Sequence, residues 1–472
     1  MTSHTIYYSL PISLQNMVCS AYGLQQRSIR YGGGFRDRLR WLLSSDYSSR
    51  EEIDRYQNVQ LAALVHHAYE TVPHYRQILD SYGLNPGEIQ DQSDLKKLPI
   101  LTKEDVVSKF DQLISRAFRK RSARKAKTSG TTGTALSFLT TRAAIEFQWA
   151  VWWRHRHRFG IEPGTKHLNF TGKPIAANSQ QQPPFWRWNY PMSQALIGMQ
   201  HISPSKVKPL IDFINSEKFA FFSGYPSLIH SFAALAEEAG LSISEKPGCI
   251  FLGAEGVDEN QKSVIEEVTG AVVTDQYGFS EGCGNASRCE HGVYHEDWEF
   301  GLLEGVDAEV LPDGSQRARI VATGFANYAF PFIRYEVGDV GVWAPDDYCC
   351  PCGRNSRVLF RIEGRSEDYI VTPEGARIMR FDYIFKETTG VRMAQVVQRE
   401  LGAILVRVVP RPDYSRSDNE KIVRMVRDCI SPTIAVDIEV VKEIPSGRSG
   451  KFRPVVSELV PKLKATNGSG AT

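Results

Sequence analysis

The middle of the chain repeats a pattern in which an apolar run ends in a glycine turn. The runs FAFFSGY, CIFLGAEG and AVVTDQYG have this form, and the segment VDENQKSVIEEVTG between the last two has helical character. A strand, a glycine turn, a helix and another strand are typical of α/β units. The sequence therefore predicts an α/β fold for the main body of the chain.

The pattern changes on either side of this body. Residues 1–95 carry apolar residues at helical spacing, and we expect them to form helices that pack on the large domain. Beyond about residue 300 we expect short, separate strands in FGLLE, DAEVL and ARIVATG. After Gly364 the strands AILVRVVP and IAVDIEVV and a helix from Asp418 to Cys429 indicate a small α+β unit. We therefore predict three regions, 1–95, 96–364 and 365–472.

Charge and cysteine content argue against several classes of protein. The 472 residues hold 56 Lys and Arg against 54 Asp and Glu, whereas a dedicated nucleic-acid binder usually has a basic excess. We therefore interpret the basic, Trp-rich segment AAIEFQWAVWWRHRHRFG as a helix with one aromatic face. The sequence lacks a run of about 18 apolar residues and a signal-peptide pattern, so we expect no membrane span. Eight cysteines are too few for a disulfide scaffold and favour a reduced, cytoplasmic protein.

Two turns in the large domain carry residues suited to a nucleotide. Residues 128–134, TSGTTGT, combine hydroxyl donors with glycines that let backbone N–H groups approach an anion, which makes them a candidate phosphate cradle. Composition alone leaves a flexible loop as the alternative. Residues 275–281, DQYGFSE, follow a buried run, and ligands of α/β sheets bind at such strand ends. Tyr277 could stack on a base and Glu281 could hold Mg²⁺, with an ordinary turn as the alternative.

Three later segments carry further candidate groups. Asp339, after the glycine of RYEVGD, could accept hydrogen bonds from both hydroxyls of a ribose. The segment GRSEDY lies where the composition changes and where an interdomain hinge is expected. Lys451 lies in SGRSGKFR, a small loop that could deliver a point charge to a phosphate or carboxylate.

Taken in order, the five segments resemble the motifs of the adenylate-forming ligases, which include acyl-CoA synthetases and firefly luciferase. TSGTTGT stands at the phosphate loop of that family, YGFSE resembles its Tyr-Gly-x-Thr/Ser-Glu motif, RYEVGD its ribose motif, GRSEDYI its hinge and SGRSGK its catalytic-lysine motif. LPISLQNMVCSAYG, ETVPHYR, LPILTKEDV, TGFANYAFPFIRYEVGD and SGKFRPV resemble the phenylacetate–CoA ligases and their CapK-like branch. The resemblance extends from about residue 10 to residue 460. It implies a large adenylate-forming domain built of α/β sheets and a small, mobile α+β C-terminal domain.

The resemblance assigns a role to each matching residue. The β- and γ-phosphates of ATP would be cradled by Thr128, Ser129, Gly130, Thr131, Thr132 and Gly133. The adenine side of the nucleotide would be bound by Gly253, Ala254, Glu255, Tyr277, Gly278 and Ser280. Glu281 would bind Mg²⁺, Asp339 the ribose, and Arg365 the ribose or a phosphate, while Glu367 takes the hinge position, where Asp is usual. Lys451 would bridge the carboxylate and the α-phosphate. One departure is that Thr134-Ala135 follow Gly133 where Lys-Pro is common, which puts tight ATP binding in doubt.

The cysteines of the large domain indicate a metal. Cys289, His295, Cys350 and Cys352 make a Cys₃His set, a common structural Zn²⁺ site, and the resemblance implies a similar zinc near the acyl pocket. His291 is a weaker alternative to His295. Free buried cysteines are the competing interpretation.

These roles predict an ATP-dependent ligase that converts a carboxylic acid into an acyl-AMP and passes the acyl group to CoA. The substrate would be an aryl acid or a similar acid. The pocket for its acyl group would be lined by Tyr225, Pro226, Phe279, Cys283 and Gly284. The cofactors implied are ATP, Mg²⁺, Zn²⁺ and CoA. Two alternatives stay open: transfer to an amine or hydroxyl of a sugar or natural-product scaffold, which the capsule association of the CapK-like branch suggests, and nucleotidyl transfer of the coenzyme F390 synthetase type. A non-catalytic nucleotide-binding partner is disfavoured because the charged groups are all present.

Overall fold

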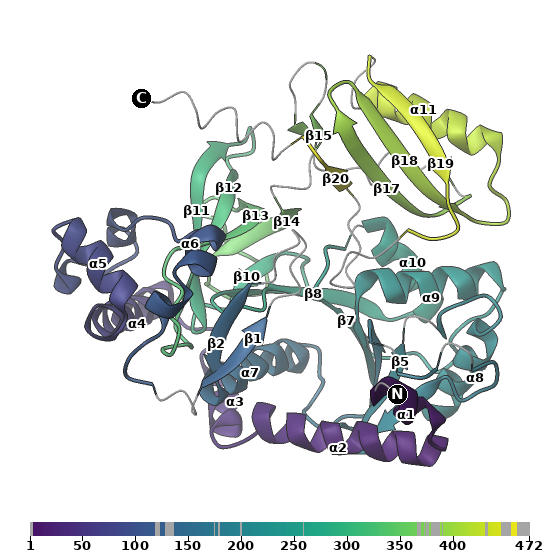
Figure 1. Cartoon of the computed structure of the whole chain (residues 1–472), viewed down its shortest axis with the longest axis horizontal. Coiled ribbons are helices and arrows are strands. Elements are labelled where there is room, and N and C mark those ends of the chain that lie inside the picture. Colours follow the sequence, from purple (N-terminus) through teal and green to yellow (C-terminus); the bar gives the residue numbers. More distant parts are fainter. Residues whose placement is uncertain are drawn as a thin grey trace. The chain divides into compact units, whose positions relative to one another are not determined.

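A computed structural model of the chain describes residues 3–118, 123–127, 136–173, 175–177, 180–198, 201–257, 259–365, 370–371, 373, 377–378, 388, 390–429, 433–444 and 455–459. The chain falls into two compact units (Figure 1). The first unit holds residues 1–255, 264–337 and 341–362, and the second holds residues 256–263, 338–340 and 363–472. The three regions predicted from the sequence stay predictions.

The apolar runs in the middle of the chain form neighbouring parallel strands, as predicted. β3 (His167–Thr171), β6 (Phe221–Gly224), β7 (Cys249–Leu252) and β8 (Val272–Gly278) are hydrogen-bonded in that order, each parallel to the next. The connecting helices are α8 (Val207–Glu217), α9 (Pro226–Glu238) and α10 (Glu259–Thr269). β7 is buried along its whole length, which agrees with its uninterrupted apolar sequence CIFL.

These strands lie inside one long mixed sheet (Figure 1). Among the described residues the sheet has 12 strands in the order β11-β12-β13-β14-β10-β9-β8-β7-β6-β3-β5-β4. The remaining strands of this sheet are β4 (Trp186–Asn189), β5 (Gln194–Gly198), β9 (Asn285–Arg288), β10 (Tyr294–Glu296), β11 (Gly301–Val310), β12 (Gln316–Gly324), β13 (Tyr335–Trp343) and β14 (Val358–Arg365). A separate antiparallel hairpin is formed by β1 (Ala123–Lys127) and β2 (Ser137–Thr141).

The expectation of two strands in FGLLE and DAEVL is wrong. Both segments belong to the single strand β11, which pairs with β12 along its length. The register shifts between Val306 and Glu309, and Asp307 between them has a φ of 55°. A bulge of this kind places an extra residue in the strand and interrupts the alternation of its side chains without ending it.

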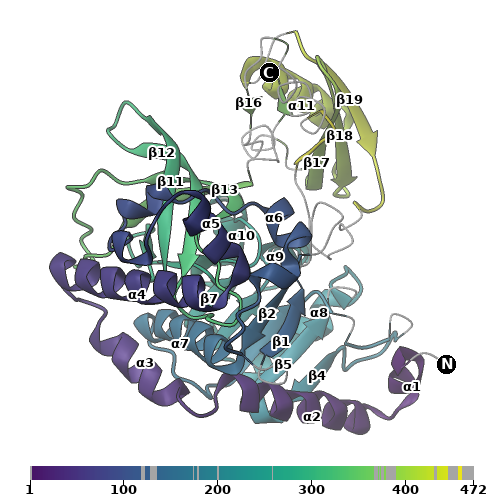
Figure 2. The ribbon, with the colours of Figure 1, turned by 60° about the vertical axis from the view of Figure 1, so that its left-hand side comes forward.

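The predicted N-terminal helices are present, and several of them contribute to the main core. The helices of residues 1–95 are α1 (Ser3–Ser9), α2 (Ile12–Arg30), α3 (Phe35–Ser44), α4 (Arg50–Thr71) and α5 (Pro73–Ser81). The next helix, α6 (Lys103–Ser108), follows this region. Ser49 and Glu52 form the capping box at the start of α4, and Pro73 begins α5. Leu61 and Leu64 of α4 share one apolar cluster with Leu302 of β11. The ribbons of α4 and β11 can be followed in Figure 2. The helical region therefore packs within the first unit.

The aromatic side chains of the Trp-rich helix α7 (Arg142–Arg158) gather on one core cluster. Phe147 and Trp153 belong to this cluster with residues of α3 and β6, and Trp149 and Trp152 pack against it. Trp152 also donates its indole N–H to Asn285 Oδ1 at 3.2 Å. Arg154 of the same helix is 1% exposed. The single aromatic face stays a prediction.

The second unit has its own sheet and core. β17 (Val391–Glu400), β18 (Ala403–Pro410), β19 (Ala435–Val440) and β20 (Val455–Ser457) form a sheet in the order β19-β18-β17-β20. α11 (Arg416–Cys429) contributes Ile422 and Val426 to the apolar cluster of this sheet, and β15 (Ile370–Val371) pairs with β16 (Arg377–Ile378). This is the separate α+β domain expected at the C-terminal end. In the part of the chain that the structure describes, none of the helices combines the length and apolarity needed to cross a bilayer.

Candidate active site and metal centre

Three parallel strands of the first unit end in the segments that the sequence assigned to nucleotide and acid binding. Tyr225 and Pro226 follow β6, Gly253 follows β7, and Tyr277 and Gly278 end β8. Because β6, β7 and β8 are parallel neighbours, their carboxyl ends lie at one edge of the sheet. Ligands of open α/β sheets bind at such an edge.

The turn after β7 is tied to the start of α9. Ala254 has a φ of 68°, a left-handed conformation that is uncommon for a residue with a β-carbon. The next residue, Glu255, accepts a hydrogen bond on Oε2 from the backbone N–H of Ser227 at 3.1 Å, in the first turn of α9. Burial, and then the negative charge of Glu255, raises the pKa of Tyr225, so this tyrosine stays protonated. The predicted adenine segment and the predicted acyl segment therefore meet at one helix N-terminus.

The turn after β8 presents two aromatic rings and a carboxylate. The half-buried rings of Tyr277 and Phe279 meet edge to face, with 5.8 Å between their centroids. Ser280 is exposed, and Glu281 is half-buried. The hydroxyl of Tyr335, the first residue of β13, donates to Glu281 Oε1 at 3.2 Å. This arrangement can offer a flat apolar surface and an anionic group to one ligand.

Cys283 and Gly284, which were predicted to line the acyl pocket, lie deeper than the turn. Cys283 is 1% exposed and belongs to the main apolar core. Its burial, reinforced by the charge of Glu281, raises the pKa of the thiol well above its usual range, so the thiol is protonated. A β-carbon at Gly284 would lie 2.6 Å from Leu303 and 3.1 Å from Phe279. A larger residue at position 284 would therefore require the side chains of Leu303 and Phe279 to shift.

Other predicted site residues are less fully described. Asp339 lies on β13 and is half-buried. Arg365 is the last residue of β14, and its side chain lies outside the described part of the chain. The phosphate loop, the hinge residue and the catalytic lysine are also outside the described residues: Thr128, Ser129, Gly130, Thr131, Thr132, Gly133, Glu367 and Lys451.

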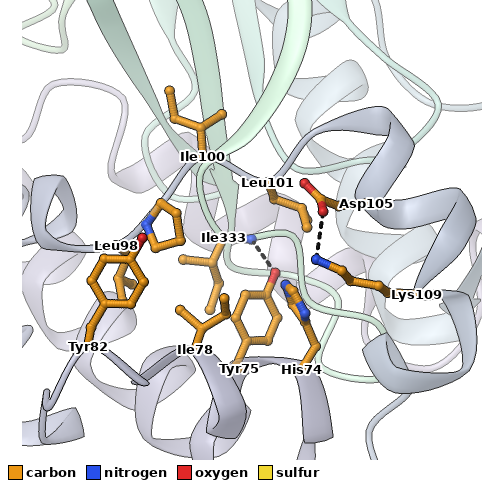
Figure 3. Close-up of a pocket in the computed structure, with 11 residues that line it drawn as sticks. His74, Tyr75, Ile78, Tyr82, Leu98, Ile100, Leu101, Asp105, Lys109 and Ile333 are labelled. Atoms are coloured by element: carbon orange, nitrogen blue, oxygen red, sulfur yellow. Dashed lines mark hydrogen bonds and ion pairs between the residues drawn. The ribbon is translucent and has the colours of Figure 1, made fainter. Parts of the chain in front are cut away.

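A small cavity borders the segment that leads into β13. It has a volume of about 160 Å³ and is lined mostly by apolar side chains, among them Leu101 and Ile333 (Figure 3). Tyr75 reaches this segment, since its hydroxyl donates to the carbonyl of Pro331 at 2.9 Å and accepts from the N–H of Ile333 at 3.0 Å. The predicted nucleotide and acyl residues are not among the residues that line this cavity.

The four predicted metal ligands come together, and we name them the Cys/His cluster: Cys289, His295, Cys350 and Cys352. Their ligand atoms all lie within 4.8 Å of one another. Cys289 follows β9, His295 is in β10, and both other cysteines lie in the loop between β13 and β14. His291 is exposed and is not part of the group, although its backbone N–H donates to Cys289 Sγ at 3.4 Å.

The distances within the Cys/His cluster fit a tetrahedral ion. The Sγ atoms of Cys289 and Cys350 are 3.8 Å apart, and a tetrahedral Zn²⁺ with its usual Zn–S bonds places two sulfurs roughly 3.8 Å apart. His295 Nε2 lies 3.2 Å from Cys352 Sγ. Burial, aided by the charges of Arg158 and Arg354, lowers the pKa of His295 to about 4, so its imidazole is neutral and can be a ligand. The donor set and spacing therefore suit zinc.

A buried ion-pair network adjoins the Cys/His cluster, and sequence analysis missed it. We name it the arginine network; its members are Asp46, Arg154, Arg158, Asp297, Glu299 and Arg354. Arg154 pairs with Asp297 at 2.8 Å and with Glu299 at 2.9 Å. Arg354 donates to Asp46 Oδ2 at 3.0 Å, and Arg158 binds the same carboxylate at 3.1 Å. Although burial alone would raise the pKa of Asp46, the charges of its arginine neighbours hold it well below its usual range.

The arginine network also explains why the basic residues of α7 make no surface patch. The side chains of Arg154 and Arg158 are 1% and 6% exposed, and both face carboxylates. Arg354 links the network to the Cys/His cluster, because it lies two residues after Cys352 and pairs at 3.0 Å with Glu290, the residue after Cys289. Only the excess of Glu and Asp between Glu290 and Glu299 could have indicated the network from sequence.

Comparisons with known proteins agree with the fold and with the separate C-terminal domain. Residues 370–458 match the family model of the CapK C-terminal domain. Protein CapK of Staphylococcus aureus is 23% identical over 462 residues, which cover 96% of this chain and 99% of that protein. Phenylacetate–coenzyme A ligase of Aromatoleum evansii is 27% identical over 340 residues, and that of Thermus thermophilus is 25% identical over 440 residues. These matches cover 69% and 86% of this chain and 73% and 97% of the two ligases, respectively.

A solved structure has the same fold. The crystal structure of a 2-hydroxyisobutyryl-CoA ligase in the postadenylation state superposes with a TM-score of 0.68 at 19% identity. The superposition covers 90% of this chain and 94% of that one. The chain therefore has the fold of this adenylate-forming CoA ligase, carries a CapK C-terminal domain, and has relatives named CapK and phenylacetate–coenzyme A ligase.

Proposed function

We propose that this protein is an AMP-forming acid–CoA ligase that activates an aryl or similar carboxylic acid. The observation that carries the proposal is that the segments after β6, β7 and β8 lie at one sheet edge, with the aromatic rings and Glu281 at the last of them. The relatives named phenylacetate–coenzyme A ligase support an aryl acid as the substrate and CoA as the acceptor. We also propose a cytoplasmic location and a second unit that moves as a lid.

The proposed reaction has two steps. A carboxylate oxygen of the acid attacks the α-phosphorus of ATP, the bond to the β-phosphate breaks, and pyrophosphate leaves. The thiolate of CoA then attacks the acyl carbon, the bond to AMP breaks, and AMP leaves. In this scheme Lys451 and the hydroxyl loop at residues 128–133 offset charge on the phosphates, and Tyr277 holds the adenine.

Two metal ions fit the proposal. Glu281 offers an oxygen ligand for Mg²⁺, which would neutralise charge on the phosphates of ATP. The Cys/His cluster offers a closed set of sulfur and nitrogen ligands for Zn²⁺, which would hold the loop between β13 and β14 against β10. A site without an open coordination position is structural, so we assign zinc no step of the reaction.

A second candidate acceptor is an amine or hydroxyl group on a sugar or natural-product scaffold. It is favoured by the CapK matches, because CapK matches 96% of this chain and the second unit matches the CapK C-terminal domain. The Aromatoleum ligase matches only 69%. In the proposed scheme both acceptors share the adenylation step and differ only in the second step.

The test is product analysis by mass spectrometry with ATP, Mg²⁺ and a panel of aryl and short-chain acids, with and without CoA. We expect AMP and an acyl-CoA mass that forms only with CoA. Acyl-AMP and pyrophosphate without a thioester would move the assignment to an amine or hydroxyl acceptor. Absence of nucleotide turnover with every acid would contradict the proposal.

The catalytic lysine has its own test. We expect Lys451→Ala to slow acyl-AMP formation at least 100-fold, because the charge on the α-phosphate loses its fixed partner. Lys442→Ala is a matched control, since Lys442 is an exposed lysine of the same unit. Adenylation at the rate of the unmodified protein in Lys451→Ala would refute the role given to this residue.

A further inference from the structure

Glu281, the proposed Mg²⁺ ligand, is held by a buried tyrosine of the RYEVGD segment to which the sequence analysis gives no role. The Tyr335 hydroxyl donates to Glu281 Oε1 at 3.2 Å, and Tyr335 is 3% exposed. The two residues are 54 positions apart in the sequence and both belong to the first unit. The contact joins the turn after β8 to the first residue of β13.

Tyr335 is itself fixed on several sides. Its main chain is pinned by Leu101, which donates to the carbonyl of Arg334 at 2.9 Å and accepts from the N–H of Glu336 at 3.0 Å. Its ring packs against that of Phe332, with 4.9 Å between the centroids. A buried ring in a close-packed core has one arrangement, so its hydroxyl has a fixed position. The fixed hydroxyl therefore restricts the rotation of the Glu281 carboxylate.

A restricted carboxylate is what a magnesium site requires. Mg²⁺ demands near-ideal octahedral geometry, so a freely rotating ligand binds it poorly. The hydroxyl of Tyr335 fixes the direction of Glu281 Oε1, and groups that orient a metal ligand in this way tune the metal. Asp339, the proposed ribose ligand, lies four residues further along the same strand β13.

We propose that Tyr335 is a positioning residue that orients Glu281 for the Mg²⁺ bound with ATP; the inference rests on the proposed function. A tyrosine that merely fills the core would contribute stability and leave the metal affinity unchanged. Removal of the Tyr335 hydroxyl therefore distinguishes the two roles by its effect on metal affinity.

The test compares Tyr335→Phe with the unmodified protein by titrating Mn²⁺ in the presence of a non-hydrolysable ATP analogue, with free Mn²⁺ read by electron paramagnetic resonance. We expect an affinity loss of about 10-fold, the lower end of what removal of such an orienting group costs. In pyrophosphate exchange, the Mg²⁺ concentration for half-maximal rate should rise similarly, while the rate at saturating Mg²⁺ changes less than about twofold. Phe keeps the ring, so the core stays filled.

Tyr75→Phe is the matched control. Tyr75 is also a buried tyrosine of the first unit, and its hydroxyl bonds only main-chain groups among its recorded partners, at Pro331 and Ile333 (Figure 3). We expect Tyr75→Phe to lower the unfolding temperature and leave the Mn²⁺ affinity unchanged. Glu281→Gln should weaken Mn²⁺ binding, and adding Tyr335→Phe to it should weaken binding no further.

The outcomes separate the inference from the proposed function. Unchanged Mn²⁺ affinity in Tyr335→Phe, beside weakened affinity in Glu281→Gln, would overturn the positioning role and leave the proposed function intact. Equal weakening of Mn²⁺ binding in Tyr335→Phe and Tyr75→Phe would also overturn the positioning role and leave the proposed function intact. Failure of the unmodified protein to bind the nucleotide with Mn²⁺ would overturn the proposed function, and the role of Tyr335 with it.

Discussion

The arginine network and the Cys/His cluster are neighbours in the first unit, but only the network is complete without an added ion. In the network the guanidiniums of Arg154, Arg158 and Arg354 face the carboxylates of Asp46, Asp297 and Glu299. In the cluster three thiols and a neutral imidazole converge within 4.8 Å. A group of side chains that compensates its own charges indicates a structural role, whereas a group of converging donors indicates a bound cation.

The difference also determines how much stability is lost when a residue of either region is substituted. A buried charge that loses its partner stays buried, and its desolvation is then uncompensated. A set of neutral donors that loses its metal leaves weakly polar thiols, which behave as small apolar groups when protonated. We therefore expect the network to be more sensitive to a single substitution than the cluster.

The largest effect is expected at Asp46, which touches all three arginines of the network. Asp46→Asn keeps the size of the side chain and removes the charge, so the network is left with an excess positive charge. We expect a loss of about 3–5 kcal/mol in the free energy of unfolding of the first unit. Urea unfolding followed by circular dichroism measures it.

Asp37→Asn is the control for this substitution. Asp37 also pairs with an arginine, Arg40, but the two side chains are 79% and 78% exposed. We expect a change of less than about 1 kcal/mol there. Equal effects at Asp46 and Asp37 would contradict the claim that burial makes the network sensitive.

The next effect concerns the metal of the Cys/His cluster. Protein purified without chelator should hold about one zinc per chain, and Cys352→Ser should lose it. At a free Zn²⁺ concentration 100 times its dissociation constant, the loss should lower the free energy of unfolding by about 2.7 kcal/mol. Metal analysis and thermal unfolding with and without a chelator measure both quantities.

Cys349→Ser is a matched control in the same loop. Cys349 adjoins Cys350 in the sequence but is exposed and is not part of the cluster. We expect it to keep its zinc and its unfolding temperature. The same zinc content in both serine variants would show that the four residues do not form the site.

The central strands and each half of the Cys/His cluster could be predicted because their signals are local. That the two halves meet, with Cys289 and Cys350 61 positions apart, was inferred from the set of ligand types and from the family resemblance. CIFLGAEG is one apolar strand with its turn, and Cys350-Pro351-Cys352 places two sulfurs on one tight loop. The spacing of Cys289 and His295 matches two adjoining antiparallel strands, β9 and β10. Local spacing of this kind survives folding, because each signal lies within one turn or one hairpin.

The arginine network and the Tyr335–Glu281 contact could not be predicted, because both join distant parts of the chain. Arg154 meets Asp297 across 143 residues, and Tyr335 meets Glu281 across 54. Five arginines and histidines in a row, Arg154 to Arg158, look like surface until their partners are known. A local pattern carries no information on which distant carboxylate neutralises a charge, so burial of Arg154 was not foreseen.

The smallest effect is the pH dependence of zinc binding, measured per pH unit. Burial raises the pKa of the Cys350 thiol to about 12, so the metal-free thiol is protonated near neutral pH and must lose its proton to bind zinc. His295, with its pKa lowered to about 4, is already neutral and releases no proton above about pH 5. The affinity should therefore rise at least tenfold per pH unit between pH 6 and 8, or about 1.4 kcal/mol per unit.

Zinc titrations by calorimetry in buffers of different ionisation enthalpy would count the released protons independently of the slope. The network should not respond over this range, because its arginines hold the pKa of Asp46 far below it. A zinc affinity independent of pH between pH 6 and 8 would contradict the claim that the Cys/His cluster, unlike the arginine network, needs an added cation. It would mean that Arg354, two residues from Cys352, already holds the sulfurs as thiolates, and that the network supplies the positive charge that we assign to the metal.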